Sequence, residues 1–365
     1  MSRTQQDPKK NRTFWLVSAR FDGAWVFAPP LLAVAMVLAL PQLRTFEIPP
    51  WGFLVFVIFI DVGHVYASLY RTYWDADEMA RRRGLYVATP LLCWIVGVML
   101  YAQGSIVFWR VLAYMAVYHF VRQQFGFMML YRHRMGERDP WDKRLDTAVI
   151  YASMLYPLAF WHSTERNFQW FLPGDFFTLP PWVGSAAAWI HGSLLTLFVL
   201  RQLQLWTTRR FVNPGKIGVV LSTAAVWFVG IVFLNSDFAF TVTNVVAHGV
   251  PYVALVWLYG RRRWQGQGNW LETLHRPAYG VAFVGLLLAF GYLEEGVWDV
   301  LVWQEHASLF ASWLGSLPTP ELSEELLMLV VPLLTVPQAT HYVLDAWIWK
   351  FDGSNPDLKE HLFPT

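Results

Sequence analysis

Five histidines and two aspartates lie inside apolar stretches of this chain, where ionisable side chains are costly and usually functional. The histidines are His64, His119, His191, His248 and His341. The stretch HYVLDAWIWK places His341 four residues before Asp345, and the stretch DVGH places Asp61 three residues before His64. In a helix both spacings put the carboxyl group and the imidazole on one face. Each pair therefore offers two ligands to one metal, or one ligand and the group that orients it.

The other two candidate helices carry polar companions at helical spacing as well. His119 precedes Gln123 by four residues, with Arg122 alongside, and His248 shares a stripe with Asn244 and Tyr252. Counted from His64, His119, His248 and His341, the next cation on the cytoplasmic side follows after 7, 13, 13 and 9 residues. These counts correspond to depths of roughly 10–20 Å, whereas His191 lies in the opposite half of its segment. Four polar stripes at similar depth are expected to face one another or a wet cavity.

Imidazole nitrogens accompanied by carboxylate oxygens suit iron, manganese or zinc. Four histidines and two aspartates exceed the three protein ligands common in catalytic zinc sites. The set predicts two metals, or one metal with carboxylates that orient the imidazoles, and iron is the first choice. The predicted ligands are His64, His119, His248 and His341, with Asp61 and Asp345 as ligands or orienting groups. Gln123, Asn244 and Tyr252 are expected to position substrate or oxygen. Arg122 is expected to neutralise Asp61, Asp345 or an anionic head group, or to reach the membrane interface.

The composition indicates a protein that crosses a membrane many times. Of 365 residues, 55% are hydrophobic and 15% are charged, and the mean hydropathy is +0.33, whereas soluble domains are about 25% charged. The single cysteine, Cys93, excludes an internal disulfide and a cysteine metal cluster. Apolar runs long enough to cross a bilayer predict ten spans, at 22–40, 51–70, 86–103, 106–131, 145–161, 184–206, 216–234, 237–259, 278–293 and 323–349.

The distribution of Lys and Arg predicts the orientation of these spans. If the N-terminus is inside, 24 of the 28 cations fall in cytoplasmic segments, two (Arg44 and Arg166) in outer loops, and two (Arg110 and Arg122) within the fourth span. Such a bias is typical of inner-membrane proteins. We therefore predict a bacterial cytoplasmic-membrane protein with both termini cytoplasmic. Residues 1–21 form an N-terminal segment, 22–350 one membrane domain and 351–365 a cytoplasmic tail. Two long outer loops, 162–183 and 294–322, are expected to form an ordered outer cap, and the second also has the pattern of an interfacial amphipathic helix.

Other functions remain open at this point. Haem is disfavoured because the four histidines share one depth and have carboxyl neighbours, whereas stacked haems occupy two depths. A proton-coupled transporter is the main alternative, with Asp61, His64, Arg122, His248 and Asp345 as a relay; Pro332 and Pro337 would suit a broken helix. A structural subunit whose polar cluster only holds helices together is a third reading. The sequence has no GxSxG, P-loop or CxxC motif.

The stretch HYVLDAWIWK resembles the closing motif of uncharacterised bacterial multi-pass membrane proteins that end in HYxxDxxIWK. The plan of single histidines on several membrane helices is also similar to that of the Brp/Blh-type carotene dioxygenases, iron-dependent membrane enzymes that cleave carotene to retinal. This second resemblance lies in the pattern over most of the chain. It implies only that His64, His119, His248 and His341 are candidate ligands. Histidine boxes of the HxxxH and HxxHH types are absent from the sequence, which argues against ordinary acyl desaturases.

Together these observations predict an all-α membrane protein with about ten transmembrane helices around a polar cavity in the cytoplasmic half. The expected function is a metal-dependent oxidoreductase, an oxygenase in particular, that acts on an apolar, lipid-soluble substrate. Its expected partners are the lipid bilayer, that substrate and an electron donor. The net charge of +2 gives no indication of a nucleic-acid partner.

Overall fold

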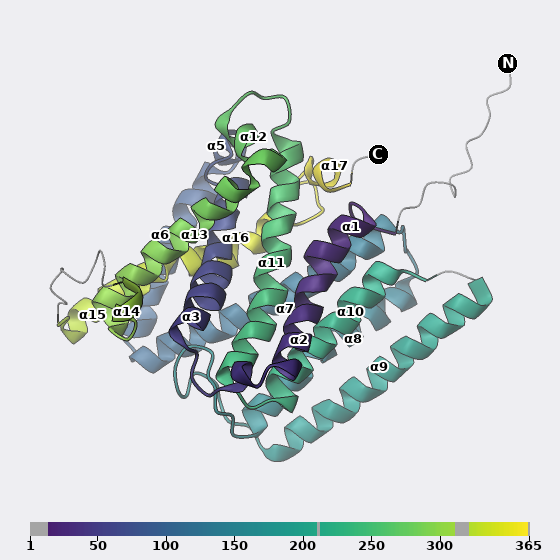
Figure 1. The fold of residues 1–365 in the computed structure, drawn as a ribbon, viewed down its shortest axis with the longest axis horizontal. Helices are drawn as coiled ribbons and strands as arrows, with labels where there is room; N and C mark the ends of the chain where they lie inside the picture. The colour runs from purple at the N-terminus through teal and green to yellow at the C-terminus, as the bar shows by residue number, and fades with distance from the viewer. Residues whose placement is uncertain (1–13, 210–211, 311–320, 364–365) are drawn as a thin grey trace.

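The computed structural model describes residues 14–209, 212–310 and 321–363, and these residues form helices and no strand (Figure 1). The long helical segments are α1–η1–α2 (Ala19–Ala39), α3–η3–α4–η4 (Pro50–Arg71), α6 (Arg83–Tyr101), α7 (Ser105–Arg134), α8 (Pro140–Ser163), α9 (Pro181–Arg209), α10–η5 (Pro214–Phe233), α11 (Asp237–Arg263), η6–α13–η7 (Pro277–Trp303) and the pair α15 (Glu324–Leu334) and α16 (Val336–Ile348). Short helices connect them: η2 (Pro41–Arg44), α5 (Ala76–Arg81), α12 (Trp270–Leu274), α14 (Ala307–Phe310) and α17 (Leu358–Leu362).

The predicted all-α class with several membrane-type helices is confirmed. Seven of the described helical segments are long and apolar enough to cross a bilayer, and an eighth qualifies if α15 and α16, bent by 40°, form one span. The segments predicted at 106–131 and 145–161 are helical, as α7 and α8, but they are not among these candidates. α7 is lined with polar and charged residues on several sides, and α8 begins with the polar sequence PWDKRLD. The number of ten crossings therefore stays a prediction.

Helix α11 lies inside the bundle, and the other helices are arranged around it. In its most apolar window 72% of residues are buried, compared with 17% for α6 and for α9, which face outward. A helix that is apolar on most sides is stable only when surrounded, and α11 packs against α2, η3, α4, α7 and α10. Gly249 permits this close packing, since a Cβ there would lie 2.9 Å from the carbonyl oxygen of Ile60.

Local sequence signals explain where several helices begin and break. The Asp139 side chain accepts hydrogen bonds from two amides of the first turn of α8, and Pro140 occupies the first helical position. The Ser236 side chain caps α11 in the same way. Pro337 lies in the first turn of α16 and cannot continue the hydrogen-bond ladder of α15. The chain therefore bends there, just before the turn that carries His341.

The ninth helix is longer than the sequence suggested. The prediction ended this span at residue 293 and placed 294–322 in an outer loop, but α13 continues to Trp298 and η7 to Trp303. The added turns contain the acidic residues Glu294, Glu295 and Asp299. In the structure Glu294 accepts a hydrogen bond from Tyr66, and Asp299 accepts backbone hydrogen bonds from residues 305 and 306. These partners allow the helix to carry Glu294 and Asp299. Part of the predicted interfacial helix, 311–320, lies outside the described residues.

The segment predicted as a cytoplasmic tail packs onto the bundle as far as residue 363. Leu358 and Leu362 of α17 are buried in the main apolar core. The Asn355 amide donates to the carbonyl oxygens of Trp347 and Lys350, and its oxygen accepts from Arg71 at 3.2 Å. This segment therefore covers the end of the bundle where both termini lie (Figure 1).

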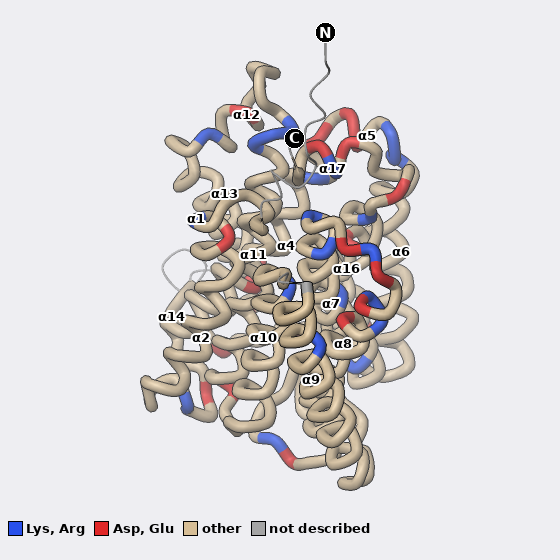
Figure 2. The backbone as a smooth tube through the Cα atoms, turned by 90° about the vertical axis from the view of Figure 1, so that its right-hand side faces the viewer, with Lys and Arg blue, Asp and Glu red and all other residues tan. Residues whose placement is uncertain are grey.

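Charged residues gather at that same end of the molecule. Figure 2 shows Lys, Arg, Asp and Glu gathered around α5, α12 and α17 and in a second group near the labels α16 and α8, whereas fewer lie at the opposite end. Several are paired, such as Arg263 with Asp75 at 3.0 Å. The pattern agrees with a polar end in water and an apolar body in lipid. The predicted N-terminal segment, 1–21, lies largely outside the described residues.

Candidate metal centre

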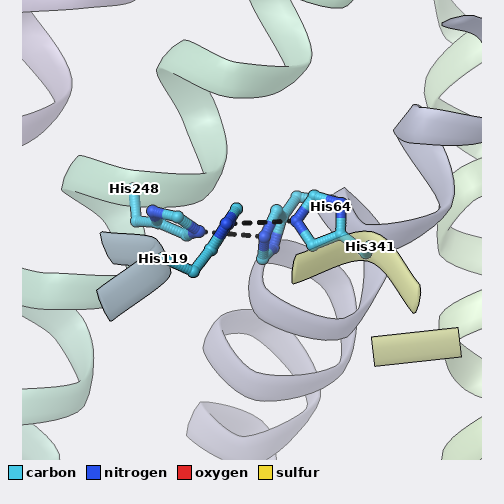
Figure 3. Close-up of side chains that lie close together, drawn as sticks. All are labelled: His64, His119, His248 and His341. Carbon is cyan, nitrogen blue, oxygen red and sulfur yellow. Dashed lines mark hydrogen bonds between the residues drawn. The ribbon is translucent and has the colours of Figure 1, made fainter. Parts of the chain in front are cut away.

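Four histidines from four helical segments meet inside the bundle (Figure 3). His64 comes from α4 (Gly63–Ala67), His119 from α7, His248 from α11 and His341 from α16. Each is at most 5% exposed. The Nε2 atoms of His64 and His248 are 3.0 Å apart, and those of His119 and His341 are 3.1 Å apart. One ring nitrogen from each of the four lies within 4.8 Å of all the others. The prediction that these four histidines converge is confirmed.

The close packing of two helices sets part of this geometry. Gly249 follows His248, and its missing side chain lets α11 approach the backbone of Ile60, four residues before His64. The bend between α15 and α16 then turns His341 toward His119 on α7. Segments far apart in sequence thus contribute one ligand candidate each.

Two of the nitrogen separations match those of neighbouring ligands on one metal ion. Metal–imidazole bonds of about 2.0–2.1 Å separate neighbouring ligand nitrogens by about 3.0 Å at a right angle and about 3.4 Å at a tetrahedral angle. The two observed contacts, 3.0 and 3.1 Å, match the shorter value. Without a metal, each contact can place only one proton between two buried nitrogens. With a metal, all four lone pairs have a partner.

Carboxyl groups face the outer ring nitrogens of three of these imidazoles. Asp345 Oδ1 lies 3.7 Å from His341 Nδ1, and its Oδ2 lies 4.0 Å from His119 Nδ1. Asp61 Oδ1 lies 3.7 Å from His64 Nδ1. Both aspartates thus lie on the side of the histidines away from the close Nε2 contacts, where a carboxyl group can orient an imidazole. Two carboxylates would balance the charge of one divalent ion held by four neutral imidazoles.

Tyr252 extends this arrangement by one more hydrogen bond. Its hydroxyl donates to Asp345 Oδ1 at 2.7 Å, and the Tyr252 side chain is only 2% exposed. The outer nitrogens of His64, His248 and His341 have no hydrogen-bond partner among the described residues. Buried polar atoms of this kind normally find partners. A small movement of each ring toward its aspartate would supply one for His64 and His341.

The two amides singled out from the sequence lie close to the centre. Gln123 donates to the backbone carbonyl oxygen of His248 at 2.8 Å and so ties α7 to α11 beside two of the histidines. Asn244 donates to the carbonyl oxygen of Phe240 at 3.1 Å. The side-chain oxygens of both Gln123 and Asn244 are buried without a partner in the described part of the chain. Of the two, Asn244 lines a cavity, so its oxygen is free to accept from a ligand.

Arg122 lies elsewhere. Its side chain is exposed, donates to the Tyr151 hydroxyl at 2.7 Å and lies over the ring of Phe125. No contact between Arg122 and Asp61 or Asp345 occurs among the described residues. The expected neutralisation of these aspartates is therefore not seen, and Arg122 contacts Tyr151 and Phe125 instead. The rotation of α7 against its neighbours sets this direction, because it turns Gln123 toward α11 and leaves Arg122 on the outer face.

Two aromatic residues next to the histidines were missed by the sequence analysis. The ring of Phe120 stacks on His248 with centroids 3.7 Å apart, and Tyr342 lies 4.9 Å from His119. The signal was an aromatic residue directly after a histidine, in YHF and THY. Adjacent positions point in different directions on one helix, so only the packing between helices reveals that each ring covers a histidine of another helix.

A large cavity of about 720 Å³ adjoins the histidine cluster. Asp61, Phe120, Asn244 and Tyr342 line the part nearest the histidines, and residues 46–48, 167–172 and 305–306 line the other part. These latter residues belong to loops at the end of the bundle opposite the two termini (Figure 1). The expectation of a polar cavity in the cytoplasmic half stays a prediction, and the cavity found here is bounded by the long loop 164–180 and by η7.

The chain was also compared with known proteins. No family model, no curated protein and no solved structure matches it. The functional argument therefore rests on the geometry of the site.

Proposed function

We propose that this chain is an integral-membrane oxidoreductase that uses a metal ion, with iron as the first choice, to oxidise an apolar, lipid-soluble substrate. The observation that carries the proposal is the convergence of four buried imidazoles from four helical segments on one point. All-nitrogen ligand sets without thiolate suit iron, zinc or manganese. Iron held in this way would supply the activation of molecular oxygen.

The residues of the chain have separate roles in this proposal. His64, His119, His248 and His341 hold the ion, while Asp61 and Asp345 fix the ring orientations and balance its charge. Tyr252 keeps Asp345 in place. Phe120 and Tyr342 cover the histidines on the cavity side and limit the access of water. The substrate occupies the cavity that these two rings help to line.

The membrane setting completes the proposal. All ten helical segments cross the bacterial cytoplasmic membrane, with α15 and α16 as one bent span and α7 and α8 shielded by their neighbours. Both termini are cytoplasmic, which agrees with the charge-rich end in Figure 2. On this orientation the cavity opens in the outer half, and an electron donor, where the reaction needs one, is a separate partner.

Oxygen uptake by the purified protein tests this function. Full-length protein loaded anaerobically with ferrous iron is mixed with a membrane lipid extract and oxygen, and the lipids are analysed by mass spectrometry. We expect oxygen uptake and an oxidised lipid with iron-loaded wild type, and neither with zinc-loaded wild type or His119→Ala. Equal uptake by the zinc-loaded protein would contradict the proposal.

A proton-coupled transporter is the second candidate, and the bend between α15 and α16 favours it. Broken helices near buried ionisable groups are common in transporters, and this bend of 40° lies close to His341 and Asp345. The transporter reading predicts pH-dependent solute uptake by proteoliposomes with no stoichiometric metal. The oxidoreductase reading predicts stoichiometric metal and no uptake driven by a proton gradient.

A further inference from the structure

The cavity beside the histidines combines aromatic walls with carboxyl groups. Its wall includes four tryptophans, Trp109, Trp170, Trp298 and Trp303. It also includes six acidic residues: Glu47, Asp61, Asp237, Glu294, Glu295 and Glu305. No Lys or Arg is among the described residues that line it. A bound molecule therefore meets apolar rings, carboxyl groups and neutral polar side chains such as Gln169, Thr241 and Gln338, but no fixed positive charge apart from any held by His306 at the rim.

The acidic groups extend from the rim toward the histidines. Glu47 and Glu305 are exposed, whereas Asp61, Glu294 and Glu295 are partly buried. Glu294 is bonded to Tyr66, and Asp61 faces His64. Glu295 forms no hydrogen bond or ion pair with the described residues. Asp237, also partly buried, likewise has no side-chain partner among the described residues, so Glu295 and Asp237 are the two inner carboxyl groups that are free to contact a ligand.

A buried amide adds a second, independent indication. Asn244 lines the cavity, is 3% exposed and has a side-chain oxygen with no donor among the described residues. Its nitrogen is already used in a bond to the Phe240 carbonyl oxygen. An acceptor left unmatched in a buried place is costly, so a ligand that supplies a donor would be favoured.

We infer that the cavity takes an apolar chain with a hydrogen-bond-donating, non-anionic head group, an alcohol or an amine, and rejects fatty acids and phospholipids. This inference rests on the proposed function and names the substrate class of the same site. A carboxylate or phosphate would lose its water here without gaining a cation, which is strongly unfavourable. A hydroxyl or ammonium group would meet acceptors such as Asn244 and Glu295, and the tryptophans would stabilise the chain and a cation.

A matched series of fluorescent polyenes tests the inference. Parinaric acid, its alcohol and its amine share one chain and differ only in the head group. Each polyene is titrated into full-length, detergent-purified protein, and energy transfer from the cavity tryptophans to the polyene is recorded. Only the signal that is lost when the saturated analogue of the same polyene is added is counted as specific binding. We expect the alcohol and the amine to bind at least about tenfold tighter than the acid, since like charges in an interface cost several kcal/mol. Glu295→Gln should weaken the preference for the amine, and Glu165→Gln, an exposed residue off the cavity, should not.

The outcomes separate this inference from the proposed function. Binding of the acid as tightly as the alcohol, or displaceable binding of none of the three, would overturn the inference even if the protein holds stoichiometric metal. The wild-type series alone decides this, so a variant that fails to fold does not obscure it. The titration is repeated with His341→Ala. If wild-type protein holds no metal but still prefers the alcohol and the amine, the proposed oxidation is overturned and the cavity assignment stands.

Discussion

Asp345 faces two of the four imidazoles, and its substitution offers a graded test of how the centre is built. Its two carboxylate oxygens lie 3.7 Å from His341 and 4.0 Å from His119, and its side chain is 9% exposed. Asp61 faces only His64, and its side chain is 27% exposed. Loss of such an orienting carboxylate typically weakens metal binding by about 10–100-fold. We expect Asp345→Asn near the upper end of this range and Asp61→Asn near the lower end.

The expected difference is large enough to measure. About 100-fold corresponds to about 2.8 kcal/mol of binding free energy, and about tenfold to about 1.4 kcal/mol. Purified wild type and variants are titrated anaerobically with a chelator of known affinity, and the bound metal is measured by elemental analysis. Asp352→Asn, an exposed substitution in the C-terminal segment, is the matched control and should bind as wild type does. An unchanged affinity in Asp345→Asn, or a larger loss in Asp61→Asn, would refute the assignment of the carboxylates.

Three further predictions concern the stability of the scaffold. Asp146→Ala should lower the free energy of unfolding by about 3–5 kcal/mol, because the buried amine of Lys216, 3.1 Å from Asp146, then has one fewer partner. A loss of less than about 1 kcal/mol in a denaturant titration would contradict this. Asn355→Ala should release the C-terminal segment and speed its proteolysis, because the Asn355 side chain forms four hydrogen bonds to other residues of the bundle. Unchanged cleavage would show that α17 alone holds the segment in place. Burial raises the pKa of Glu78, but Tyr86 and nearby arginines outweigh burial and lower it below the usual value. Its contribution to stability is therefore present at neutral pH and lost as the pH falls through the lowered pKa. Glu78→Gln should destabilise the protein at pH 7 and less in acid, and equal destabilisation at both would argue against this.

The all-α class and the similar depth of the four histidines along their helices could be predicted from the sequence, because both depend on local patterns. Apolar runs determine which segments enter lipid, and counting from each histidine to the next cation gives its depth. The i, i+3 and i, i+4 spacings also placed Asp61 beside His64 and Asp345 beside His341, as found. These relations lie within one helix.

Relations between helices were beyond the sequence. The second contact of Asp345, to His119 on α7, depends on the bend before α16. The outward direction of Arg122 depends on how α7 is rotated against its neighbours. The wall of the cavity comes from the fold of loop 164–180 and from the extended ninth helix. Single-helix patterns carry no information on such packing.

Elemental analysis of the purified protein tests the central claim most directly. Full-length wild type, the His64→Ala/His341→Ala double variant and His191→Ala, a buried histidine away from the cluster, are reconstituted anaerobically with ferrous iron and freed of unbound metal. Circular dichroism shows whether the helices are kept. The account predicts stoichiometric metal in wild type and His191→Ala and none in the folded double variant. Folded wild type without metal, or a double variant that retains it in full, would contradict the account.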